Sequence, residues 1–549
     1  MELRFGMCVL LLSATGIVNG DLYTALIDLE ALVETEAVLL SELDNYIGAT
    51  ERRLSQLRRL AAEYSREHSE AIADVSAYLH NPINAYRLIK RLTIDWKHVE
   101  SLMDDFGEKE WLERRGRLML PSEEDLVGAV SGLLRLQDTY QLDTASLARG
   151  QLNGVQYTTH LTADDCFQIG RISCVNLDHY HTVLWMSEAL KLYHHEDNVK
   201  RYHQEDNIKR YHHEDNIKLY HHEDNVRRRE ILECLTYSTY KQGNVRSALQ
   251  LNDELLSIAP KHLFALSNRT IYLADIEKGT EQVAENLLDE YTELYYQLCR
   301  DALSPSPQVL SQLKCQYVHR NQPFLRIAPL KEEEAYLDPR IVLYRDVIYD
   351  GEIDVIKKLA LPRLQRATVR ASKRAVVIPV SHRISKSAVL LFAEHPSIER
   401  LNRRIEMMTS LTMAYSPLLH VVNYGIGGYY KPHWDFAQGP HRNIVIYGDN
   451  IRDGNRVATV LSYMSDVAQG GATVFPYLNV TVQPKKGTAL VWYNMHLSGE
   501  GDLATMHAAC PVLVGCKWVT NKWVNERGQE FRRPCALHRQ TRYSTNWYS

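Results

Sequence analysis

The residues best suited to chemistry lie in the segment "KPHWDFA", which places His433 and Asp435 two residues apart. In a strand, residues i and i+2 lie on the same face, so the imidazole and the carboxylate can both reach one metal ion. The same pair is also common on ordinary protein surfaces. If the pair binds a metal, a further ligand must come from another strand.

The segment "GDLATMHAACPVLVGCKWVTNKW" supplies a third ligand and a cation. With His507, two histidines and one carboxylate form the facial triad of non-heme iron(II) oxygenases, which leaves coordination positions open. Lys517 follows, and Pro511 and Gly515 allow a turn that returns it on the adjacent strand. A lysine there can pair with the far carboxylate of a dicarboxylate that chelates the metal. The combination predicts an iron(II)- and 2-oxoglutarate-dependent dioxygenase, and Tyr424 is a further candidate for the 2-oxoglutarate pocket.

Short β-type runs surround these residues, with turn residues such as Gly470-Gly471 between most of them. They lie at residues 375–378, 420–422, 458–463, 472–475 and 489–493. Such spacing predicts a β-sandwich or jelly roll. We place this catalytic domain at residues 336–549, after a helical linker at 281–335.

The N-terminal part has a helical pattern, and we place a helical dimerisation domain at residues 21–146. Apolar residues recur every seven positions, as a and d positions of a heptad do. The a series is Leu26, Val33, Leu40, Ile47 and Leu54, and the d series includes Leu29, Leu43 and Leu57. Glu36 and Thr50 interrupt the d series. A coiled-coil dimer and an amphipathic helix packed within its own chain both remain open.

A second helical block, which we place at residues 147–280, resembles a tetratricopeptide unit. Leu235, Gly243, Ala248 and Pro260 have the order and spacing of its two helices and turn. Such units expose a concave face, and aromatic-lined grooves bind proline-rich peptides in the polyproline II form. Candidate ligand-binding residues there are Tyr180, Tyr237 and Tyr240. Packing of these tyrosines in the core is the alternative.

The same block contains a nine-residue repeat, "YHHEDNVKR", at residues 193–226. At about 100° per residue, nine residues turn a helix by two and a half turns, so successive copies face opposite sides. No continuous histidine face forms. We therefore interpret the repeats as a solvated helical or disordered insertion and not as a metal site.

The chain has 549 residues, which predicts two to four domains. It is 45% hydrophobic and 24% charged, with a net charge of −5, so no basic excess favours a nucleic-acid binder.

Residues 1–20 predict a secretory signal peptide, with a buried N-terminal strand or helix as the alternative. No later segment is apolar enough to span a bilayer. The sequons at Asn268 and Asn479 are typical of glycosylation in the secretory pathway.

Four C-terminal segments carry a resemblance to a known family. They are "NYGIGGYYKPHWDFA", "GNRVATVLSYMSDVAQGGATVFP", "PKKGTALVWYN" and "SGEGDLATMHAACPVLVGCKWVTNKWVNERGQEFRRPC". The chain resembles the α subunits of collagen prolyl 4-hydroxylase along nearly all its length after the signal. The resemblance implies dimerising helices, a tetratricopeptide-like peptide-binding domain and a double-stranded β-helix. It implies iron(II) at His433, Asp435 and His507, and the 5-carboxylate of 2-oxoglutarate at Lys517.

The implied reaction is hydroxylation at C4 of proline in Xaa-Pro-Gly units of procollagen. It is coupled to oxidative decarboxylation of 2-oxoglutarate to succinate and CO2, with O2 as oxidant and L-ascorbate to restore oxidised iron. A dioxygenase for another peptidyl residue, such as lysine, is one alternative, and an inactive collagen-binding chaperone or scaffold is another. The implied partner is protein disulfide isomerase in an α2β2 tetramer, and the implied location is the lumen of the endoplasmic reticulum.

The cysteines add expectations that rest on the same resemblance. It implies disulfides Cys299–Cys315 and Cys510–Cys535. The state of Cys166, Cys174, Cys234 and Cys516 is open. Compared with the family, Cys234 replaces a tyrosine of the peptide-binding domain, Trp434 a phenylalanine and Lys431 a glutamate.

Overall fold

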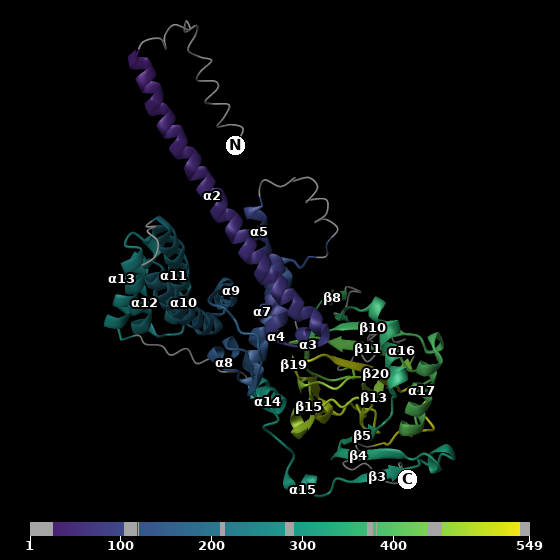
Figure 1. The fold of residues 1–549 in the computed structure, drawn as a ribbon. Coiled ribbons are helices and arrows are strands. Elements are labelled where there is room, and N and C mark those ends of the chain that lie inside the picture. Colours follow the sequence, from purple (N-terminus) through teal and green to yellow (C-terminus); the bar gives the residue numbers. More distant parts are fainter. Residues whose placement is uncertain are drawn as a thin grey trace. The chain divides into compact units, whose positions relative to one another are not determined.

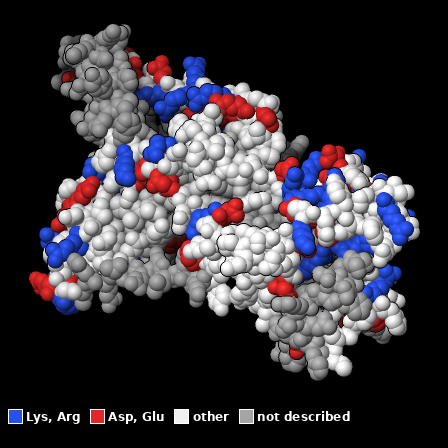
Figure 2. Space-filling view, turned by 90° about the horizontal axis from the view of Figure 1, so that it is seen from below, with Lys and Arg blue, Asp and Glu red and all other residues white. Residues whose placement is uncertain are grey.

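The computed structural model describes residues 26–103, 118, 120–208, 215–279, 290–370, 377–379, 382–437 and 453–537. The chain divides into two compact units (Figure 1): Met1–Asp74 with Ile94–Leu120, and Val75–Thr93 with Pro121–Ser549. The predicted signal peptide lies outside the described residues. None of the described helices is long and apolar enough to cross a membrane. On the face shown in Figure 2, side chains of both charges are interspersed among uncharged ones.

The first unit is built on one long helix, α2 (Leu26–Ala73), with α5 (Trp96–Leu102). The rings of Tyr64 and Trp96 lie 6.3 Å apart between these helices. The heptad side chains Leu40, Leu43 and Ile47 are 55%, 52% and 44% exposed. They are therefore not packed against the rest of the chain.

The second unit begins with helices of different lengths. They are α3 (Val75–Leu79), α4 (Pro82–Lys90), α7 (Glu123–Tyr140) and α8 (Thr144–Ala148), followed by the hairpin β1 (Gln151–Leu152) and β2 (Val155–Gln156). A capping box between Ser122 and Asp125 begins α7. This helix closely approaches the turn at Gly427, whose φ is +66°. A Cβ at Gly427 would lie 3.1 Å from the Cα of Gly132 on α7, so the contact requires glycine.

Five helices form the tetratricopeptide-like domain: α9 (Ala163–Val175), α10 (His179–Ile208), α11 (Asp215–Lys241), α12 (Val245–Ile258) and α13 (Leu263–Glu277). Gly243, with a φ of 83°, forms the turn between α11 and α12. The disulfide Cys174–Cys234 joins α9 to α11. The nonapeptide repeats are helical through Ile208 and again from Asp215; residues 209–214 lie outside the described residues.

The C-terminal part is an antiparallel jelly roll of two main sheets, as predicted. The larger has the order β3 (Cys315–Val318), β4 (Leu330–Leu337), β5 (Arg340–Arg345), β17 (Ala489–Tyr493), β13 (Arg456–Tyr463), β20 (Lys517–Asn525), β11 (Leu419–Tyr424), β10 (Lys386–Leu390) and β6 (Gln365–Arg366). The smaller has the order β16 (Val480–Val482), β15 (Thr473–Phe475), β18 (His507–Ala509), β12 (Tyr429–His433) and β9 (Arg383–Ile384).

Two further strand pairs and four helices complete this part. The pairs are β14 (Gln469–Gly470) with β19 (Val512–Val514), and β7 (Thr368–Arg370) with β8 (Val377–Pro379). The helices are α14 (Glu290–Cys299), α15 (Pro307–Leu310), α16 (Asp350–Ala360) and α17 (Pro396–Thr409). Buried Val422, Tyr463 and Trp492 of the large sheet share one core with Phe475 and Ala509 of the small sheet.

The predicted helical linker at 281–335 is wrong in its second half, because β3 and most of β4 lie there. The sequence of β4 does not indicate a strand, because "LKEEEAYL" contains three consecutive glutamates. Glu332 is 2% exposed and pairs with Arg320 and Arg340, and Tyr344 donates a hydrogen bond to it at 2.8 Å. These partners make burial of the carboxylate tolerable in a strand.

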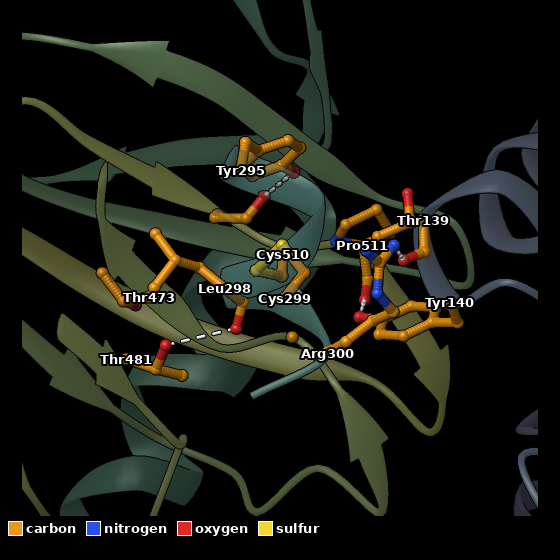
Figure 3. The surroundings of a disulfide bond; sticks show 12 residues. Thr139, Tyr140, Tyr295, Leu298, Cys299, Arg300, Thr473, Thr481, Cys510 and Pro511 are labelled. Carbon is orange, nitrogen blue, oxygen red and sulfur yellow. Dashed lines mark hydrogen bonds between the residues drawn. A yellow bond between two sulfur atoms is a disulfide. The ribbon is translucent and has the colours of Figure 1, made fainter. Parts of the chain in front are cut away.

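The two predicted disulfides among Cys299, Cys315, Cys510 and Cys535 are also wrong. Figure 3 shows Cys299 bonded to Cys510, across a sequence separation of 211 residues. Cys315 and Cys535 are exposed free thiols. The physical reason is the position of α14 beside the small sheet, which brings its last residue to the end of β18. Cys315 instead begins β3, an edge strand of the large sheet.

Candidate active site

The pairing of β12 with β18 brings the candidate metal ligands together. His433 and His507 are register partners in these strands, and Asp435 is the second residue after the end of β12. The ligand atoms of the three residues lie within 4.8 Å of one another. The Nε2 atom of His433 is 3.8 Å from one Asp435 oxygen, and Nε2 of His507 is 3.6 Å from the other. Within the part of the chain that the structure describes, no other such group of three occurs.

Backbone carbonyls fix the orientation of both imidazoles. Nδ1 of His433 lies 2.8 Å from the Lys431 oxygen, and Nδ1 of His507 lies 3.1 Å from the Thr505 oxygen. A carbonyl oxygen can only accept, so each Nδ1 carries the proton. Each Nε2 therefore has its lone pair free for a metal, which is the usual second-shell arrangement of ligating histidines.

Two donors hold the carboxylate of Asp435. The hydroxyl of Thr459 on β13 and the indole N–H of Trp523 on β20 donate to Oδ2, at 2.8 and 2.9 Å. The amide of Asn494 donates in turn to the Thr459 hydroxyl at 2.9 Å. Oδ1 accepts no hydrogen bond from the described residues, so it is the oxygen left for a metal. The sequence patterns did not identify these supporting residues.

The electrostatics favour the protonation state that binds a divalent cation. Burial, with the neighbouring His507, lowers the pKa of His433 to about 3. Burial alone would raise the pKa of Asp435, but His507, His433, Arg456 and the Trp523 hydrogen bond lower it to about 2. At neutral pH His433 is therefore neutral and Asp435 is ionised. Such a set of two nitrogens and one carboxylate oxygen fits iron(II).

Lys517 begins β20 and is 1% exposed. Its Nζ donates to the Gly471 carbonyl at 2.6 Å and lies 3.4 Å from the Thr473 hydroxyl. None of the carboxylates in the described residues pairs with it, and burial lowers its pKa to about 7. The centroids of the Tyr424 and Tyr463 rings each lie 5.6 Å from Nζ. A buried cation without a counter-ion suits the distal carboxylate of 2-oxoglutarate.

The route by which Lys517 reaches the site differs from the prediction. It does not return on a strand adjacent to His507, because β18 belongs to the small sheet and β20 to the large one. Lys517 instead reaches from the large sheet to Gly471 and to Thr473 of β15 in the small sheet. Its neighbour Thr473 is the register partner of Ala509, two residues along β18 from His507. Lys517 thus contacts the strand that pairs with the strand of His507.

The candidate peptide-binding tyrosines lie on α10 and α11. Tyr180 and Tyr237 are 46% and 40% exposed, so the alternative of core packing does not apply to them. The Tyr240 hydroxyl donates to Asp275 at 2.8 Å, and its ring stacks on the buried Tyr272 with centroids 4.6 Å apart. Tyr240 is therefore held more firmly than the other two.

The remaining predicted residues are placed as follows. Asn268 lies on α13 and Asn479 follows a short 3-10 helix; both are partly exposed, as glycosylation requires. Cys166 is a buried free thiol. Cys516 is also free, and its sulfur accepts a hydrogen bond from the Asn423 amide at 3.0 Å. Cys174 and Cys234 are paired with each other.

Three family models match the chain. The prolyl 4-hydroxylase α-subunit N-terminal region matches residues 25–154, and the prolyl 4-hydroxylase peptide-substrate-binding domain matches residues 163–213 and 202–278. The 2OG-Fe(II) oxygenase superfamily matches residues 419–525.

Full-length relatives agree with these domains. Prolyl 4-hydroxylase subunit alpha-2 of Caenorhabditis elegans is 42% identical over 542 residues, covering 96% of this chain and 95% of that protein. Prolyl 4-hydroxylase subunit alpha-1 of Homo sapiens is 39% identical over 541 residues, covering 94% and 95%. Among solved structures, the viral collagen prolyl hydroxylase vCPH from Paramecium Bursaria Chlorella virus-1 is 21% identical, covers 34% of this chain and 95% of that chain, and gives a TM-score of 0.27.

Proposed function

Since the chain belongs to the family of prolyl 4-hydroxylase α subunits, we propose that it hydroxylates C4 of proline in Xaa-Pro-Gly units of procollagen. The chain is a 2-oxoglutarate-dependent dioxygenase that hydroxylates proline, and it has a domain for proline-rich peptide substrates. The family implies iron(II), 2-oxoglutarate and O2, and ascorbate is typical of it. The observation that carries the proposal is the His433–Asp435–His507 group in a jelly roll that also buries Lys517, whose Nζ has no carboxylate partner among the described residues.

The residues have distinct parts in this chemistry. Nε2 of His433, Nε2 of His507 and Oδ1 of Asp435 would hold iron(II). When bound, iron(II) would activate O2, which oxidises 2-oxoglutarate to succinate and CO2 and delivers its other oxygen atom to the proline. Lys517 would pair with the 5-carboxylate and so orient the cosubstrate. The buried walls of the jelly roll exclude water from the reacting groups.

The substrate specificity is tested by peptide-dependent turnover. We expect repeats of Xaa-Pro-Gly to release succinate in step with the formation of 4-hydroxyproline, measured by mass spectrometry. Matched peptides with lysine in place of the target proline should release succinate only at the peptide-free rate. Turnover of the lysine peptides would favour a different residue specificity. Absence of turnover on either, with peptide binding intact, would favour the scaffold function.

We also propose that the chain works in an α2β2 tetramer with protein disulfide isomerase in the lumen of the endoplasmic reticulum. The family resemblance supports the partner. The exposed heptad residues of α2 support association of two α chains through this helix. The location follows from the proposed substrate, because procollagen must be modified before its triple helix closes and hides the proline.

The assembly is tested by co-expression with the isomerase and by size-exclusion chromatography with light scattering. We expect an α2β2 mass for the wild type. The double variant Leu40→Glu, Ile47→Glu should give an αβ mass, because both changes place charge in the seam. Val38→Glu is the matched control, since Val38 is 62% exposed but lies outside the a and d positions. An α2β2 mass for the double variant, or an active wild-type monomer without the isomerase, would contradict the proposal.

A further inference from the structure

A cavity of about 650 Å3 lies within the second unit, against β12 and the segments that flank β18. Helices α7 and α14 and the start of α10 form one side, and β12 with the segments flanking β18 form the other. Rings make up much of its lining, notably Tyr291, Tyr295, Tyr296, Tyr429, Pro432 and Tyr477. The volume is within the range of ligand-binding cavities, roughly 300–1,000 Å3.

The cavity reaches both strands that carry the candidate metal ligands. Pro432 and Met506 line it, and each directly precedes a ligand, His433 or His507. On the opposite wall it reaches His181, the neighbour of the exposed Tyr180 on α10. The cavity thus touches residues next to one candidate peptide-binding tyrosine and next to two candidate ligands, while the ligands themselves do not line it.

Bonds across the cavity's walls hold them in place. The disulfide Cys299–Cys510 fixes α14 to the end of β18, and the Tyr295 hydroxyl donates to the Ala509 carbonyl at 3.1 Å. Figure 3 shows both, together with the Arg300 guanidinium, which donates to the Thr139 carbonyl of α7 at 3.1 Å. The cavity is thus a fixed part of the fold.

Most charged groups of the lining are already occupied by other protein groups. His181 lies between two carboxylates, 3.0 Å from Asp138 and 2.7 Å from Asp178. Arg135 donates to the Gly427 carbonyl at 2.9 Å and lies over the Tyr429 ring at 4.3 Å. What remains for a ligand is mainly aromatic faces and proline rings, together with the exposed Lys431. Such a lining suits an uncharged peptide more than a charged one.

We propose that this cavity is a second peptide-binding site, which holds the substrate segment next to the target proline. The ligand class is a proline-rich peptide in the polyproline II form. Its preset backbone docks on aromatic surfaces at little entropic cost. The inference rests on the proposed function, since it concerns the path of the same substrate from the tyrosines of α10 and α11 to the metal site.

The first test is kinetic and uses the double variant Tyr291→Ser, Tyr477→Ser in the co-expressed full-length enzyme. These rings are 58% and 46% exposed and contact each other edge-to-face at 6.4 Å, so their loss should leave the fold intact. We expect the KM for long Pro-Pro-Gly repeats to rise about tenfold, as for the loss of an interface anchor. The KM for 2-oxoglutarate and the kcat should not change. Tyr317→Ser is the control, since Tyr317 is 71% exposed on β3.

The second test measures occupancy without turnover. A proline-rich peptide with a photoreactive benzoylphenylalanine a few residues from the target proline should crosslink to residues 291–296 or 476–477, identified by mass spectrometry. Crosslinks confined to α10 and α11, or an unchanged peptide KM in the double variant, would overturn the inference. If the wild type bound and crosslinked the peptide here but did not hydroxylate it, the proposed function would fail while the peptide site stood.

Discussion

Replacing His433 or His507 with alanine is expected to abolish proline hydroxylation while leaving the chain folded and assembled. Each change removes one of two imidazole nitrogens that face Asp435 within 3.8 Å. Losing only a second-shell partner of a metal ligand lowers affinity or activity roughly 10–100-fold, so losing a ligand should exceed that range. Hydroxyproline formation measures activity, elemental analysis measures iron per chain, and circular dichroism measures the fold.

The matched control is His496→Gln. His496 is also a buried histidine of the jelly roll, 8% exposed and 3.8 Å from a carboxylate, that of Asp502. It belongs to no group of three potential ligands within the described residues. We expect this variant to keep its iron and its turnover. Wild-type turnover in either alanine variant, with iron retained, would refute the assignment of the ligands.

Replacing Lys517 with methionine is expected to raise the KM for 2-oxoglutarate by at least roughly 30-fold, since removing one partner of a buried charge pair costs about 2–5 kcal/mol. Methionine retains most of the volume but no charge. Iron content and the KM for peptide should stay near wild type. The exposed Lys485→Met is the control for loss of one positive charge. An unchanged KM for 2-oxoglutarate in the Lys517 variant would exclude the anchoring role.

The pKa of the same lysine predicts that the affinity for 2-oxoglutarate depends on pH. Burial lowers the pKa of Lys517 to about 7, so above pH 7 the ligand-free side chain is largely neutral. Binding a carboxylate then requires uptake of one proton, and the affinity for 2-oxoglutarate should fall up to tenfold per pH unit. Below pH 7 the lysine is already charged, so it should not make the affinity for 2-oxoglutarate depend on pH. In Lys517→Arg, whose side chain stays protonated, this slope should vanish in titrations above pH 7.

The site's chemistry was predictable because it depends on residue types at short spacings. His433 and Asp435 are two residues apart, although Asp435 lies just beyond β12, and His507 and Lys517 complete a set that few other functions require. The support of Asp435 by Thr459 and Trp523 was not predictable in this way. Those residues reach Oδ2 only because β13 and β20 cross behind β12, and nothing in their own spacing marks them.

The errors have a common physical cause, which is that tertiary contacts outweighed local pattern. The strand β4 has a polar sequence and was therefore not recognised as a buried strand. Its Glu332 can be buried because arginines outside β4 neutralise the carboxylate. The partner of Cys299 depends on where α14 lies and not on the distance along the chain. Periodicity, in contrast, predicted α2 and the turn at Gly243, because those features are set by near neighbours.

The bond between Cys299 and Cys510 also orders events during synthesis. The two cysteines are 211 residues apart, which at about 5–20 residues per second separates their emergence from the ribosome by roughly 10–40 s. In that interval Cys315 is the nearer thiol for Cys299, and a bond between them would have to be exchanged by thiolate attack. The strand that carries His507 can be joined to α14 only after nearly the whole catalytic domain has been synthesised. Formation of the native bond is thus one of the last covalent steps in the synthesis of the catalytic domain.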